Sequence, residues 1–194
     1  LTTAQVAALS SANLREFSSS QLHALSSAQI RAIETADLAA LTTAQVAALR
    51  TGQIESLTTS QIVALGSTQI QSLTSGQLRA LGTGQIRAIE SSDIGVLGTG
   101  QIRAFASSQM AALTSTQADA LTTDQIRAMG SAQLVGLTTA IIASLDTAQL
   151  VGLSSGQIGV LSSGQVRAIA ANDLATLSTV QLGGLGSVQI SADR

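Results

Sequence analysis

The stretch Leu1-Thr2-Thr3-Ala4-Gln5-Val6-Ala7-Ala8-Leu9 decides how this chain folds, and residues 41–49 repeat it letter for letter. Cut into eights from Thr2, residues 2–193 give 24 octads with no insertion or deletion. An unbroken short period is typical of repeat proteins, because each unit buries its apolar side only against its neighbours. We therefore expect residues 1–194 to form one solenoid array. The chain begins on what looks like the last residue of a missing octad, so we expect it to be a piece of a longer repeat region.

The octad consensus is [S/T]-[S/T]-x-Q-[I/L/V]-x-A-L, with Thr2 at position 1. Position 5 is aliphatic or Met in every octad except at Ala118, and position 8 is apolar until Asp193. Position 7 is usually small, and position 6 varies most and carries seven of the nine arginines. This pattern predicts buried side chains at positions 5 and 8, such as Ile86 and Leu81. It also predicts a neighbouring backbone beside position 7 and solvent at positions 3 and 6.

A continuous helix does not fit the period. Eight residues at about 100° each overshoot two turns by about 80°, so the apolar stripe would drift around the helix. The chain must therefore change direction in every octad. Thr2 and Gln5 have the spacing of a capping box, and Leu1 and Val6 have that of a hydrophobic staple. The prediction is an all-α solenoid with one very short helix in each octad.

Two questions stay open at this point. Position 2 is more strictly Ser or Thr than position 1, so it is either the true N-cap or a residue whose hydroxyl packs against a neighbouring coil. The alternative fold is a β-solenoid with three octads in each coil, in which Gln and Thr would form ladders. The apolar positions 5, 7 and 8 do not alternate as a strand requires, which favours the helices.

The composition excludes several classes of function. There is no Cys, Pro, Trp, Tyr or Lys, and the formal net charge is −2. The charge gives no reason to expect binding to nucleic acid, and no apolar run has the length of a membrane span. His23, the one histidine, occupies the variable position 6, so we expect a solvated side chain. We predict no catalytic, cofactor-binding or metal site, and no enzyme activity.

One polar pattern recurs at position 4. Three octads carry Asp there in place of Gln, and each follows an octad with Arg at position 6. The pairs are Arg31 with Asp37, Arg87 with Asp93, and Arg167 with Asp173. We interpret them as surface ion pairs across a corner of the chain, which typically contribute less than about 1 kcal/mol.

The run LTTAQVAALS and its variants TTAQVAAL, TTSQIVAL and TTDQIRAM resemble octapeptide-repeat tracts of large secreted or cell-surface bacterial proteins of the adhesin-like or haem-utilisation-like kind. The resemblance covers essentially the whole chain and implies an extracellular structural role. Ile141, Ala118 and the final octad depart from the pattern. No binding residues follow from it.

The expected function is that of a structural repeat segment in an extracellular fibre, filament or adhesin stalk, which assembles by stacking of octads. The alternative is a solenoid binding module that presents positions 3 and 6 to a glycan, a protein, or an ice or mineral surface.

The two ends of the array differ. The first octad, Thr2–Leu9, has the consensus sequence and does not look like a terminal repeat that covers the end of a solenoid, whereas the last octad ends in Asp193 and is followed by Arg194. An open solenoid end needs a partner, so we expect end-to-end or lateral self-association.

Overall fold

The structure is a computed structural model that describes residues 1–191. These residues form 24 helices of four to six residues, one in each octad, and no strand. The all-α solenoid of very short helices is therefore confirmed, and the β-solenoid alternative is wrong. Asp193 and Arg194 lie outside the described residues.

The chain divides into two compact units, Leu1–Leu97 and Gly98–Arg194, the second described as far as residue 191. The helices of the first unit are α1 Thr3–Ala7, α2 Ser11–Arg15, α3 Ser19–Ala24, α4 Ser27–Arg31, α5 Thr35–Ala39, α6 Thr43–Ala48, α7 Thr51–Glu55, α8 Thr59–Ala64, α9 Ser67–Ser72, α10 Ser75–Ala80, α11 Thr83–Ala88 and α12 Ser91–Gly95. Those of the second are α13 Thr99–Ala104, α14 Ser107–Met110, α15 Ser115–Asp119, α16 Thr123–Ala128, α17 Ser131–Gly136, α18 Thr139–Ser144, α19 Thr147–Val151, α20 Ser155–Gly159, α21 Ser163–Ala168, α22 Ala171–Leu174, α23 Thr179–Leu182 and α24 Ser187–Ile190. A single array over residues 1–194 stays a prediction.

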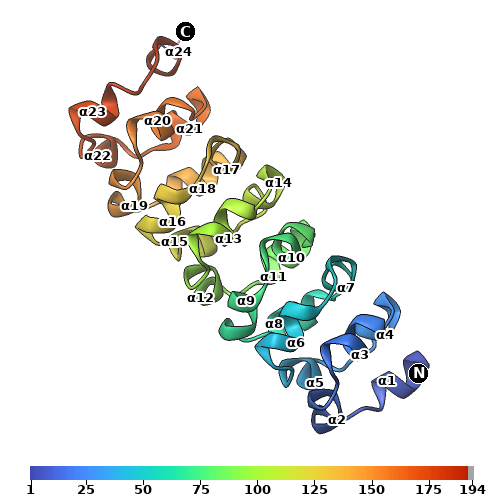
Figure 1. Cartoon of the computed structure of the whole chain (residues 1–194). Coiled ribbons are helices and arrows are strands. Elements are labelled where there is room, and N and C mark those ends of the chain that lie inside the picture. The colour runs from blue at the N-terminus through green and yellow to red at the C-terminus, as the bar shows by residue number, and fades with distance from the viewer. Residues whose placement is uncertain (192–194) are drawn as a thin grey trace. The chain divides into compact units, whose positions relative to one another are not determined.

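Within each unit a helix packs against the helix three octads away (Figure 1). In the first unit this gives three columns: α1, α4, α7 and α10; α2, α5, α8 and α11; and α3, α6, α9 and α12. In the second unit α15, α18, α21 and α24 follow the same rule. One coil therefore contains three octads, or 24 residues.

The corners between helices are made of two extended residues. Leu81 has φ −63° and ψ 133°, and Gly82, which follows it, has φ −72° and ψ 160°. No described residue, glycine included, has a positive φ. Any residue type can adopt these angles. Position 1 therefore accepts Gly, Glu or Arg as well as Ser and Thr without backbone strain.

The core consists of the side chains at positions 5 and 8. Ile86 is fully buried and Leu81 is 3% exposed, as the sequence predicts. Even Ala118, the smallest residue at position 5, is fully buried. Since six-residue helices are unstable alone, this burial between coils maintains them. Among the described residues no helix is long and apolar enough to cross a membrane.

Position 7 lies against position 2 of the previous coil, which explains why both are small. A Cβ atom on Gly136 would lie 2.5 Å from the carbonyl oxygen of Ser107, and one on Gly184 would lie 2.2 Å from that of Ser155. The Ser27 hydroxyl at position 2 also donates to the Gly52 carbonyl of the next coil, at 3.1 Å. The hydroxyl at position 2 therefore contacts a neighbouring coil, as the second of the two hypotheses for this position states.

Replacing Gly136 with Leu should destabilise the protein by about 1–3 kcal/mol, because the new side chain has to displace the backbone at Ser107. Gly156 offers a matched control, since a Cβ there meets nothing within 4 Å. Leu at that helical site should be neutral or slightly stabilising, because glycine is a poor helix former. Urea unfolding of both variants tests this, and equal effects would mean that position 7 is not a close contact.

Candidate functional site

The glutamine at position 4 is the residue that joins one coil to the next. Gln77, which is 2% exposed, accepts a hydrogen bond from the Thr74 N–H at its own helix start, with 2.8 Å between N and Oε1. Its Nε2 lies 3.0, 3.2 and 2.7 Å from the carbonyl oxygens of Val46, Ala47 and Leu49. Those carbonyls form the C-terminal end of α6, four octads earlier. One side chain therefore caps the start of its own helix and the end of another.

The same contact recurs along both units. The other glutamines with a described Nε2 contact to carbonyls 28 to 31 residues earlier are Gln29, Gln45, Gln53, Gln61, Gln69 and Gln85 in the first unit, and Gln133, Gln149, Gln157, Gln165, Gln181 and Gln189 in the second. The last carbonyls of a helix have no partner within it. In this protein a glutamine amide of the next coil supplies that partner, so the ends of these helices are completed by stacking.

This double role explains why position 1 varies more than position 4, which is Gln in 19 of the 24 octads. At Gly82 and Gly66 there is no side chain to cap the helix, yet both backbone N–H groups still donate to the glutamine Oε1, at 2.8 and 3.0 Å. Where position 1 is Thr, as at Thr74, its hydroxyl also accepts from the Gln77 N–H at 3.2 Å. Position 1 is therefore the N-cap, as predicted, and the glutamine is the constant half of the capping box.

Long polar side chains at position 6 make a second set of contacts between coils. Arg15 Nε donates to the Ala40 carbonyl at 2.8 Å, and Arg31 Nε donates to the Ser56 carbonyl at 3.2 Å. Both acceptors are position-7 carbonyls one coil later. Arg31 is exposed, as predicted for position 6, but its ordered contact is with backbone and not with a carboxylate.

The predicted pairing of these arginines with aspartates is wrong. Asp37 accepts a hydrogen bond from Ser11 Oγ at 2.5 Å, Asp93 accepts one from Ser67 Oγ, and Asp173 accepts one from Thr147 Oγ1. Each donor is the position-2 hydroxyl one coil earlier. No ion pair to these three carboxylates occurs among the described residues. The physical reason is that the stacking of coils places a position-2 hydroxyl within hydrogen-bond distance of each carboxylate.

Ile141 replaces the glutamine in octad 18 and cannot donate to the carbonyls of the earlier coil. Ile141 is 2% exposed. At the usual spacing its partners would be the carbonyls of Met110, Ala111 and Leu113. None of the described residues gives these three carbonyls an inter-coil hydrogen bond. The helix start at Thr138 also lacks the acceptor that a glutamine Oε1 supplies elsewhere.

Replacing Ile141 with Gln should therefore raise the free energy of unfolding by about 1 kcal/mol, because several hydrogen bonds form, each with a net contribution of about 0.5–1.5 kcal/mol, while some apolar burial is lost. The neighbouring Ile142 is 1% exposed at position 5 and serves as the control. Gln at position 142 has no such partners and should destabilise by at least about 2 kcal/mol. Guanidinium unfolding measures both, and equal losses would contradict the proposed role of position 4.

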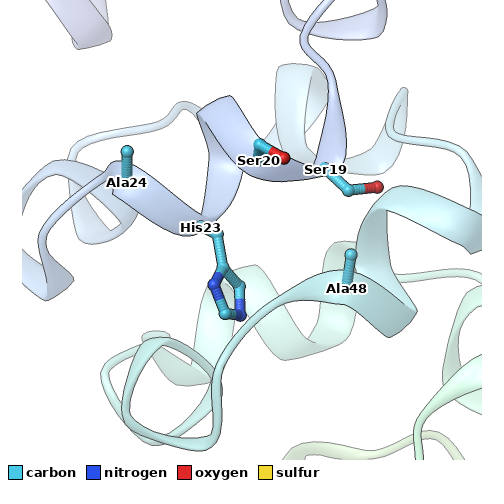
Figure 2. A pocket seen from close by; sticks show the side chains of 5 residues that line it. All are labelled: Ser19, Ser20, His23, Ala24 and Ala48. Carbon is cyan, nitrogen blue, oxygen red and sulfur yellow. The ribbon is translucent and has the colours of Figure 1, made fainter.

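His23 lies beside a shallow groove between α3 and α6. The groove has a volume of about 410 Å³ and is lined by Ser19, Ser20, His23, Ala24 and Ala48. Figure 2 shows the imidazole extending from α3, with Ala48 on the facing helix. His23 is exposed, as expected at position 6. None of the five lining residues is an acid that could orient the imidazole, and hence the groove does not present a Ser-His-acid set.

A comparison with known protein families identifies the same repeat motif as the octad consensus. The model of the ALTTAQ repeat matches the chain four times, over residues 1–32, 30–67, 86–123 and 119–147. No curated protein matches the chain. The matched segments cover well over half of the sequence, and their name is the octad motif itself, read from the alanine at position 7 through the glutamine at position 4 of the next octad. The chain therefore belongs to the ALTTAQ repeat family.

Proposed function

We propose that this repeat array is a structural segment of an extracellular fibre, filament or adhesin stalk, and that it has no catalytic role. The observation that supports the proposal is the glutamine contact between coils. It joins a side chain to backbone carbonyls, so it depends little on which side chains the previous coil carries. Length can therefore be added coil by coil without changing the contact, as a spacer or a stalk requires.

Self-association follows from the same contact as part of this proposal. The contact is heterologous, because the N-terminal side of one coil meets the C-terminal side of another. Head-to-tail stacking of this kind gives open filaments unless its rotation closes the assembly into a ring. We expect sedimentation velocity of the 194-residue chain to show elongated species that grow with concentration. A compact monomer at every concentration would overturn self-association, and an adhesin stalk would then remain as the proposed role.

The extracellular location is supported by the resemblance to surface-protein repeats. Immunogold electron microscopy of intact cells of the source organism, with antibodies raised against the array, tests it. The expected result is label on the outer surface or along fibres. Label that appears only after the cells are permeabilised would overturn the proposed location.

A further inference from the structure

Octad 18, residues 138–145, lies in the chain between two octads that glutamines join to other coils on both sides. Octad 17 and octad 19 each donate one glutamine amide to an earlier coil, and each accepts one from a later coil at its own C-terminal carbonyls. The closest of these contacts, at 2.7–2.8 Å, are Gln133 to Phe105 and Gln165 to Leu137 for octad 17, and Gln149 to Leu121 and Gln181 to Leu153 for octad 19.

Octad 18 makes neither of these contacts. Its position 4 is Ile141, which has no donor for the earlier coil. Four octads later, where a glutamine would donate to the end of α18, the chain has Asp173, and a carboxylate only accepts. No described residue gives the carbonyls of Ile142, Ala143 and Leu145 a hydrogen bond from another coil. Helix α18 is therefore joined by a glutamine to neither neighbour.

Octad 5 shows that the loss of one contact leaves the other in place. Asp37 stands at its position 4 and cannot donate to an earlier coil. The carbonyl of Leu41, at the end of the same octad, still accepts from Gln69 Nε2 at 2.7 Å. Octad 18 differs because the substitutions at Ile141 and Asp173 remove the contacts at both of its ends.

Apolar burial is what keeps α18 in the stack. Ile142 is 1% exposed and Leu145 is 4% exposed. The helices that pack against α18 are α15 and α21, and they have Ala118 and Val166 at position 5, where most octads have Leu or Ile. Smaller side chains bury less apolar area against their neighbours. The apolar contacts around α18 are therefore also weaker than those of a consensus octad.

We propose that octad 18 is an opening point in the second unit. Residues 138–145 leave the stack and return, while octads 17 and 19 stay joined to their own coils by glutamines. The free energy of such a local opening depends on the contacts that the segment itself loses, so it is lower than that of global unfolding. The inference does not depend on the proposed extracellular role.

Native-state hydrogen exchange of three matched backbone amides tests the proposal. Leu134, Ile142 and Leu150 occupy position 5 of octads 17, 18 and 19, their side chains are each 1% exposed, and each N–H donates to the carbonyl four residues earlier at 3.0–3.1 Å. Each lost hydrogen bond changes an opening equilibrium by roughly two-fold to thirteen-fold. The protection factor of Ile142 should therefore be at least about ten times lower than those of Leu134 and Leu150. Equal protection at the three amides would overturn the proposal.

Two variants show whether the missing glutamines are the cause. Ile141→Gln combined with Asp173→Gln supplies both donors, and the protection of Ile142 should rise to the level of Leu134 and Leu150. Asp173→Gln alone keeps the apolar Ile141, so it tests the proposal even if the double variant does not fold, and it should raise the protection of Ile142 several-fold.

Asp93→Gln makes the same chemical change in the first unit and is the control. It should leave the ratio of protection between Ile142 and Leu134 unchanged. Low protection of Ile142 that persists in Asp173→Gln would overturn the proposal, and so would an equal rise in that ratio in Asp93→Gln.

Discussion

Replacing Gln77 with Glu should lower the free energy of unfolding by about 3–5 kcal/mol, although Glu is the commonest alternative to Gln in a capping box. Glu can still accept from the Thr74 N–H. It cannot donate to the carbonyls of Val46, Ala47 and Leu49, and it places a buried negative charge against their oxygens. Removing one partner of a buried polar contact has the full desolvation cost of the other.

Two further variants isolate the cause. Gln77→Met keeps the length of the side chain without a charge and should be less destabilising, because only hydrogen bonds are lost. Gln21→Glu makes the same chemical change at an exposed glutamine, which accepts from the Ser18 N–H and has no Nε2 contact to another coil among residues 1–191. Its effect should be under about 0.5 kcal/mol, as at ordinary surface sites. Similar losses at positions 21 and 77 would contradict the inter-coil role of Nε2.

Replacing Leu81 with Ala should cost about 2–5 kcal/mol, because it opens a cavity at a side chain that is 3% exposed between two coils. Val63, at position 6, is 50% exposed and provides the control. Val63→Ala should change the stability by less than about 0.5 kcal/mol. Chemical unfolding followed by circular dichroism measures both, and a large loss at Val63 would mean that the faces of the octad are wrongly assigned.

The helical fold could be predicted from the sequence because its signals are local. The spacing of Thr2 and Gln5 identifies the helix start, and an eight-residue period excludes a continuous helix. Burial at Ile86 and Leu81 follows from the same repeat. These features require no knowledge of which octads become neighbours in space.

The contacts between coils could not be derived in the same way, because they depend on the number of octads in each coil. Ser11 and Asp37 are 26 residues apart, and only a 24-residue coil brings them together. Arg31 and Asp37 are closer in sequence, which led to the incorrect pairing. One signal was present, however. A capping box accepts Glu as well as Gln, yet no octad has Glu at position 4, and this indicates that a donor is needed there.

Hydrogen exchange of the glutamine side-chain amides, measured by NMR on the ¹⁵N-labelled chain, tests most directly whether the glutamines hold the coils together. The Nε2 protons of Gln53, Gln61 and Gln77 should exchange slowly, since each donates to buried carbonyls. Those of Gln5 and Gln21, which are exposed, should exchange at the rate of free amides. Fast exchange at all five side chains would contradict the stacked, glutamine-linked coil.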